Sequence, residues 1–126
     1  IGNFTGNSVP DVFLSLAKGS SSSYTDYYQV LLDGATGQVV LKDSIGQLQF
    51  ASGNAIDLNN DGRDEAIVSV NYIQNGSWKQ RLEVFDFVSN TIAPLTGFKT
   101  GVNIGSTPLF VNLDNDGLLD LVYVVK

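Results

Sequence analysis

Two short segments of this chain place oxygen-bearing side chains at alternating positions of a tight loop. One runs from Asp57 to Glu65, the other from Asn112 to Asp120, and the two align without gaps. Alternate side chains can converge on one point, and the glycine at position six permits a sharp turn because a positive φ costs glycine little. A ligand set made only of oxygen suits Ca²⁺, which takes about 6–8 such ligands, better than Mg²⁺, which retains waters in a tighter octahedron. We therefore predict a calcium ion in each segment.

The predicted ligands occupy positions one, three, five, seven and nine, and position seven contributes its backbone carbonyl. They are Asp57, Asn59, Asp61, Arg63 and Glu65 in one loop, and Asn112, Asp114, Asp116, Leu118 and Asp120 in the other. The ion would be structural: it would hold a turn between two strands and neutralise clustered carboxylates that otherwise repel each other. The alternative is a solvated turn, rich in Asp and Asn, that binds no metal.

A weaker copy of the loop, Asn3 to Asp11, opens the chain. Its oxygens come from Asn3, Thr5, Asn7 and Asp11, and Ser8 replaces the glycine at position six. Because most of the charge is lost, we expect this segment to bind metal weakly or not at all and to act as a hydrogen-bonded turn. Asn3 and Asn75 also begin glycosylation sequons, and a glycan on Asn3 would exclude a metal there.

The composition excludes several function classes. The net charge is −6, from 13 acidic and 7 basic residues, and eight of the acids lie in the three loop segments. No basic stripe favours nucleic acid, and no apolar run approaches the roughly 20 residues of a membrane span. The chain has no cysteine and no histidine, which removes disulfides and the commonest general base. It also has no methionine, so we expect a processed product or an excerpt.

The three loop segments repeat at offsets of 54 and 55 residues, and the sequence between them is typical of β-strands. We predict turns at 33–37 and at Asn75-Gly76 and a polar loop over 19–23. The predicted strands are 12–17, 27–32, 38–42, 66–73, 80–87, 91–95 and 107–111, and another follows the last loop.

Each unit would therefore hold about four antiparallel strands in some 55 residues, which is the size of one β-propeller blade. The predicted fold class is all-β, with about two and a half blades. The boundaries are 1–53 for an incomplete first blade, 54–106 for a full blade and 107–126 for the first half of a third. Because a propeller ring needs about 4–8 blades, we expect either a longer parent chain or several copies that complete each other.

The loops and the strands after them, about a third of the chain, resemble the calcium loops of FG-GAP/VCBS repeats, as found in integrin α-subunit propellers and many secreted bacterial proteins. An EF-hand would need a carboxylate at position twelve, where this chain has Val68 and Tyr123. The resemblance implies a propeller fold and bound calcium. The departures are Glu65 in place of aspartate at position nine, Asn112 at position one, and the degraded first loop.

The predicted function is that of a non-catalytic, calcium-stabilised propeller segment of a secreted or cell-surface protein that acts in adhesion or binds a protein or glycan. One alternative is a self-assembling extracellular ring or filament subunit, because unfinished blades leave strand edges that recruit other strands. Another is the non-catalytic part of a polysaccharide-active enzyme. We expect an extracellular location, no membrane insertion and no nucleic-acid partner.

Two further residue sets invite a functional interpretation. Aromatic side chains could form a sugar-stacking surface, although on strands they more often serve packing; they are Tyr24, Tyr27, Tyr28, Tyr72 and Trp78. Three acids could suggest paired catalytic carboxylates, although their spacing favours a solvated surface. They are Asp26, Glu83 and Asp86.

Overall fold

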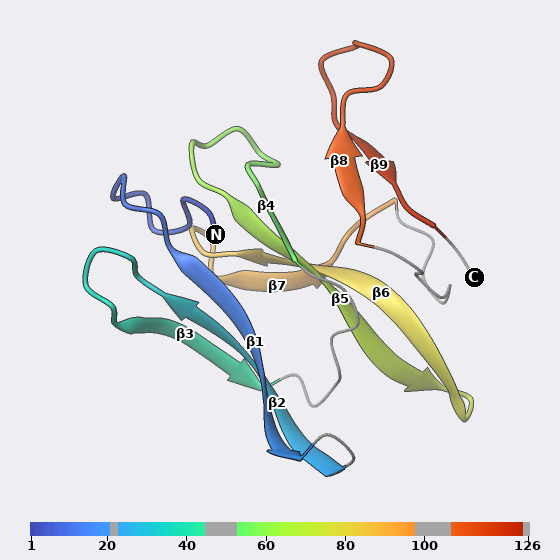
Figure 1. The fold of residues 1–126 in the computed structure, drawn as a ribbon. Coiled ribbons are helices and arrows are strands. Elements are labelled where there is room, and N and C mark those ends of the chain that lie inside the picture. Colours follow the sequence, from blue (N-terminus) through green and yellow to red (C-terminus); the bar gives the residue numbers. More distant parts are fainter. Residues whose placement is uncertain (21–22, 45–52, 98–106, 125–126) are drawn as a thin grey trace.

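The computed structural model describes residues 1–20, 23–44, 53–97 and 107–124, and all regular structure in these ranges is β (Figure 1). The predicted all-β fold class is therefore confirmed for this part of the chain, and each predicted strand range overlaps an observed strand. The strands are β1 (Val12–Ser20), β2 (Ser23–Leu32), β3 (Val39–Ser44), β4 (Asn54–Ile56), β5 (Glu65–Gln74), β6 (Ser77–Asp86), β7 (Thr91–Pro94), β8 (Leu109–Val111) and β9 (Asp120–Val122).

The strands form three antiparallel sheets whose order follows the sequence. The first sheet is β1-β2-β3, the second is β4-β5-β6-β7 and the third is β8-β9. An isolated bridge between Gly2 and Asp11 adds one further pair beside β1. This bridge corresponds to the pairs Ile56–Glu65 and Val111–Asp120. In all three sheets, a nine-residue loop segment is therefore flanked by the same strand pairing.

The hairpins are longer than the sequence indicated. The predicted polar loop over 19–23 is wrong at its ends, because Gly19 pairs with Tyr24 and Ser20 pairs with Ser23. The register shifts after Lys18, and Gly19 accommodates the irregularity with a φ of 114°. Positions 21 and 22 of this predicted loop lie outside the described residues.

The turn between β5 and β6 forms as predicted. Asn75 and Gly76 have φ values of 52° and 74°. Positive φ at both central residues is the geometry that favours Asn-Gly in two-residue hairpins. The β5–β6 hairpin consequently keeps one continuous register over nine residue pairs.

The second sheet packs between the other two, and opposite faces of β5 serve the two contacts. Ala66, Val68 and Val70 are buried in one cluster with Phe4 and Leu31 of the first unit. Ile67 of the alternate face is buried in a second cluster that includes Phe110 and Leu121 of the third sheet. Successive strand residues point to opposite faces, so burial on both sides explains why β5 is apolar from Ala66 to Val70 except at Ser69.

Candidate functional site: three related loops

The three loop segments share one backbone conformation, although their sequences differ. Positions four and six have positive φ in every loop. Position four is Gly6, Asn60 or Asn115, with φ of 73°, 59° and 62°; position six is Ser8, Gly62 or Gly117, with φ of 68°, 88° and 88°. Glycine and asparagine visit this region most readily. Position four was missed by the sequence analysis, although Gly, Asn and Asn at that position are the signal that reveals it.

Position five stabilises each loop by the same hydrogen bond. The Oδ1 atom of Asn7, Asp61 or Asp116 accepts the backbone N–H two residues later, at 3.0, 2.9 and 2.8 Å respectively. This is an Asx turn, in which a side chain replaces a backbone acceptor. The first loop retains it with a neutral asparagine. The turn therefore needs no charge at position five.

Position nine ties the end of each loop to its beginning. The Asp11 Oδ2 atom accepts the Thr5 N–H at 2.7 Å, and the Glu65 Oε2 atom accepts the Leu58 N–H at 2.7 Å. In the third loop the Asp120 Oδ2 atom accepts the N–H of Leu113 at 2.8 Å. The acid at this position is therefore engaged by backbone donors in every loop.

The second loop combines a half-buried carboxylate, Asp57, and an exposed one, Asp61, with the buried carboxylate of Glu65. Both carboxylate oxygens of Asp57 accept backbone N–H groups, from Asp61 at 3.1 Å and from Gly62 at 2.9 Å. Burial raises the pKa of Glu65, and the negative charges of Asp86, Asp61 and Asp57 raise it further. Asp86, from the end of β6, was not predicted as a neighbour of this loop. A cation beside these groups would relieve the repulsion.

This raised pKa leads to a prediction for Glu65→Gln. A folded-state pKa above the unfolded value contributes stability at low pH that is lost as pH rises through the folded-state pKa. In chelator, the free energy of unfolding of the variant should therefore rise relative to the wild type as pH increases from about 4, the ordinary value for glutamate, through the raised folded-state pKa. Urea unfolding of both proteins at each pH measures this difference. A difference that does not change with pH would contradict the electrostatic account of Glu65.

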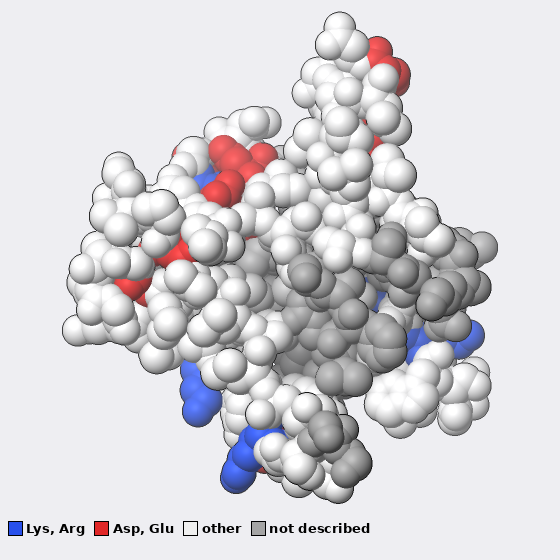
Figure 2. Space-filling model, in the orientation of Figure 1, with Lys and Arg blue, Asp and Glu red and all other residues white. Residues whose placement is uncertain are grey.

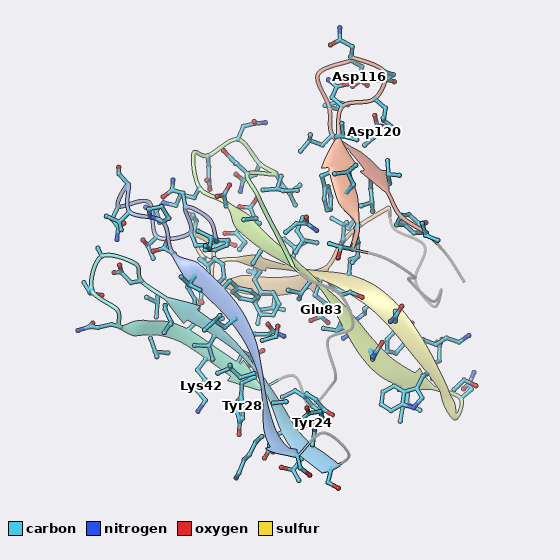
Figure 3. All side chains as sticks on the ribbon, in the orientation of Figure 1. Tyr24, Tyr28, Lys42, Glu83, Asp116 and Asp120 are labelled. Atoms are coloured by element: carbon cyan, nitrogen blue, oxygen red, sulfur yellow. The ribbon has the colours of Figure 1, made fainter. Side chains whose placement is uncertain are left out.

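The third loop projects beyond the sheets and exposes most of its side chains (Figure 3). Asp114 Oδ1 accepts the Asp116 N–H at 3.1 Å, as Asn59 Oδ1 accepts the Asp61 N–H at 2.9 Å in the second loop. At position one, the Oδ1 atom of Asn112 is buried and has no hydrogen-bond partner in the described structure. A buried oxygen without a donor is costly, and a bound cation would satisfy it.

The first loop is closed by protein groups. Asp11 is fully buried, and its Oδ1 atom accepts the Thr5 hydroxyl at 3.2 Å and the Gly34 N–H at 3.0 Å, in addition to the Thr5 N–H on Oδ2. Burial alone would raise the pKa of Asp11, but these hydrogen bonds, from Gly34 and Thr5 above all, hold it below the ordinary value. Asn7 donates to Asp33 Oδ1 at 3.1 Å. The Asp11 carboxylate and the Asn7 side chain thus join the first loop to the β2–β3 turn.

The first and second loops contact each other directly. The Asn3 N–H donates to Asp64 Oδ2 at 2.7 Å, and the Asp64 N–H donates to the Asn3 carbonyl at 3.0 Å. The Asn3 side-chain amide donates to the Gly62 carbonyl at 2.9 Å. Asn3 Oδ1 is buried and has no partner in the residues described. The position-one residue of the weak loop is thereby fixed to the carboxylate-rich loop.

The predicted calcium ligands are thus brought into loops, but the protein's own N–H groups occupy many of their oxygens. In the described ranges no group of three or more acidic side chains is arranged to hold a metal ion as it stands. Asparagine and backbone oxygens would have to complete any coordination shell. Figure 2 shows acidic side chains gathered over the loop end of the sheets.

The five aromatic side chains do not form one surface. Tyr24 and Tyr27 contact each other on β2, with ring centroids 6.1 Å apart, and the Lys42 ammonium lies 4.6 Å from the Tyr28 ring centroid (Figure 3). Tyr72 and Trp78 belong to the second sheet. They stand in adjacent register pairs of β5 and β6 and therefore point to opposite faces. A shared sugar-stacking platform is not supported by this arrangement.

The three acids outside the loops have separate local partners. Glu83 accepts two hydrogen bonds from Arg81, at 2.8 and 2.5 Å. Asp86 accepts the Ser89 hydroxyl at 2.7 Å, and Asp26 accepts the Thr25 hydroxyl at 3.0 Å. Hydrogen bonding to Ser89 lowers the pKa of Asp86. The geometry places no two of them as a catalytic pair.

In the described part of the chain there is no helix long and apolar enough to cross a membrane. No protein-family model, curated protein or solved structure matches the chain.

Proposed function

We propose that this chain is a calcium-stabilised segment of a β-propeller of the FG-GAP/VCBS repeat type. The observation that carries the proposal is the recurrence of one loop backbone at the same place beside three successive sheets. Sheets of three, four and two strands, stacked face to face, suit strands two to four of one blade, a whole blade and half of a third.

The second and third loops are the proposed calcium sites. The donor set fits a hard cation, because it consists of carboxylate, amide and carbonyl oxygens. The orphaned Asn112 oxygen and the crowded carboxylates around Glu65 each gain from a nearby positive charge. In the first loop the Asp11 carboxylate is occupied by N–H and O–H donors. The Asn3 oxygen of that loop is orphaned like that of Asn112, but Asp11 is the only carboxylate of the loop, so we propose that this loop binds an ion weakly or not at all.

The biological role proposed for the segment is non-catalytic binding or adhesion in a secreted or cell-surface protein. The loops are built around turns and strand ends, and the acids outside them are held by local hydrogen bonds. Such an arrangement favours a scaffold that a cation stabilises. The ligand would be a protein or a glycan.

Calcium should stabilise the folded chain by mass action. At a free concentration 100 times the dissociation constant, one site adds about 2.7 kcal/mol to the free energy of unfolding. Thermal unfolding in calcium, in magnesium and in chelator measures the effect, and calcium should raise the melting temperature most. A melting temperature that does not respond to calcium would refute the metal sites.

Asp61→Ala and Asp116→Ala should each remove most of the calcium response of their own loop, and the double variant should remove nearly all of it. The control is Asp26→Ala, which removes an acid from β2, away from the loops, that accepts a hydrogen bond from Thr25 and lies 4.0 Å from Lys18. The control should keep the full calcium response. Equal losses in all three single variants would indicate a general effect of net charge.

A further inference from the structure

Both contacts between sheets use the same pair of faces. Each sheet has two faces, which we name by the residues that follow position nine of its loop. The preceding face carries the first residue after position nine, which is Val12, Ala66 or Leu121 in the three sheets. The following face carries the second residue after position nine, which is Phe13, Ile67 or Val122. The following face of the first sheet packs on the preceding face of the second, since Phe13 lies 5.3 Å from Phe85, the register partner of Ala66.

The second contact repeats the first. Ile67, on the following face of the second sheet, shares a cluster with Leu121, on the preceding face of the third. Asn54 also crosses this contact, because its side-chain amide donates to the Pro108 carbonyl at 3.1 Å. The stacking is therefore directional, and each sheet offers a different face to each neighbour.

The following face of the third sheet has no neighbouring sheet in the described structure. Val122 and its register partner Leu109 are 41% and 58% exposed. The apolar residue at position two of each loop also indicates that the third sheet lacks a neighbour on this face in the described structure. Phe4 is buried between the first two sheets and Leu58 packs in the second cluster, whereas Leu113 is 67% exposed. The third sheet therefore carries the residues of a contact without the partner.

The preceding face of the first sheet is the complementary half. It carries the register pairs Val12–Leu32, Leu14–Val30 and Leu16–Tyr28. Along this face, Val30 is 5% exposed, Val12, Leu14 and Leu32 are half-buried, and Leu16 is 48% exposed. Its counterpart in the second sheet, Val70, is buried against the first sheet. The chain thus ends in two unlike apolar faces of the kinds that pair twice inside it.

We infer that the following face of the third sheet binds the preceding face of the first sheet of a second copy of this chain, head to tail. The inference rests on the stacked sheets of the proposed function and is independent of calcium. Such a contact is heterologous, so it builds a closed ring if the rotation between copies closes and a filament if it does not.

Face packing suits the strand counts better than the predicted pairing of strand edges. β1 and β9 are the same strand of the repeat, because both follow position nine of a loop. Joining the three-stranded and two-stranded sheets edge to edge would give five strands and include this element twice. Packing the faces requires no such duplication.

The test uses one substitution on each face. Leu109→Lys places a charge on the following face of the third sheet, and Leu16→Lys places one on the preceding face of the first. Val88→Lys is the matched control, because Val88 is 52% exposed and belongs to neither face. Light scattering over a range of concentrations, in calcium and in chelator, measures the mass of each protein.

The wild type and Val88→Lys should form assemblies larger than one chain, and each face variant alone should stay monomeric, because every copy lacks one of the two faces that the contact needs. An equimolar mixture of the two face variants should form dimers, because Leu109→Lys keeps an intact preceding face and Leu16→Lys an intact following face. A monomeric wild type at every concentration would overturn the inference. So would a mixture that remains monomeric while the wild type assembles, because that result indicates a symmetric interface.

Thermal melting of each variant separates loss of assembly from loss of folding. Both substituted leucines are about half exposed or more, so each variant should fold. The outcome is also separable from the calcium proposal. If the wild type assembles but its melting temperature does not respond to calcium, only the proposed metal sites are refuted. If the melting temperature responds to calcium but the wild type is always monomeric, only the proposed assembly is refuted.

Discussion

Replacing Asp11 with alanine should lower the free energy of unfolding by about 3–5 kcal/mol, because each buried donor left without a partner costs about 1–3 kcal/mol. The lost acceptor serves the backbone N–H groups of Thr5 and Gly34 and the Thr5 hydroxyl. Asp11 is fully buried, so water cannot take its place without rearrangement of the loop. Urea unfolding measures the change.

The matched control is Asp120→Ala, at the same position of the third loop. Asp120 also accepts a backbone N–H, from Leu113, but that contact is exposed, and water can satisfy the donor after the substitution. The expected loss is about 1 kcal/mol, the net value of one ordinary hydrogen bond. Equal losses at the two positions would show that burial of Asp11 is not the cause.

The stabilising contribution of Asp11 should also depend on pH. Its folded-state pKa is lowered by its hydrogen bonds, so its contribution is complete above the unfolded pKa and is lost as pH falls through the folded-state pKa. The wild type should therefore lose stability relative to Asp11→Asn as pH falls below about 4. A gap between the two proteins that stays constant down to acid pH would contradict this origin.

Gly34→Ala should also be strongly destabilising, with an expected cost of about 3 kcal/mol, near the upper end of what overpacking usually costs. A Cβ atom on Gly34 would lie 1.9 Å from the Pro10 carbonyl oxygen, and backbone atoms cannot rotate away as a side chain can. Moving Pro10 would also move the adjacent Asp11, which accepts the Gly34 N–H. Chemical denaturation measures the change.

Gly37→Ala, in the same turn, is the control for Gly34→Ala. Gly37 has a φ of 71° and open space around its Cβ position, so alanine there meets only the backbone cost of a left-handed conformation, about 1 kcal/mol. A larger loss at Gly37 than at Gly34 would show that the steric account of Gly34 is wrong.

The sequence was sufficient to predict the class of fold and the position of the loops. Alternating apolar residues, the Asn75-Gly76 turn and the repeated acidic segments are local signals, and local rules govern strands and tight turns. The observed strands and the turn agree with them. The ends of the β1–β2 hairpin were wrong because pairing with β2 extends β1 through Ser20, beyond what its own residues suggested.

The contacts that complete the loops could not be predicted, because they join residues that are distant in sequence. Gly34 reaches Asp11 from the β2–β3 turn, and Asp64 reaches Asn3 across 61 residues. Asp86 acts on the charge of Glu65 only after the second sheet has formed. Rules based on the spacing of residues along the sequence cannot predict these partners. The predicted unit boundaries and calcium ligands remain predictions.

The backbone shape shared by the three loops has a consequence for how their ion binding can vary. Positions four, five, six and nine maintain the turn through backbone conformation and hydrogen bonds, and the first loop keeps that shape with only one carboxylate. Position seven contributes only its backbone N–H to this turn, so its side chain can be Val9, Arg63 or Leu118 without a change of loop shape. The proposed ion sites can therefore differ from one unit to the next while the turn beside each sheet keeps the same backbone shape.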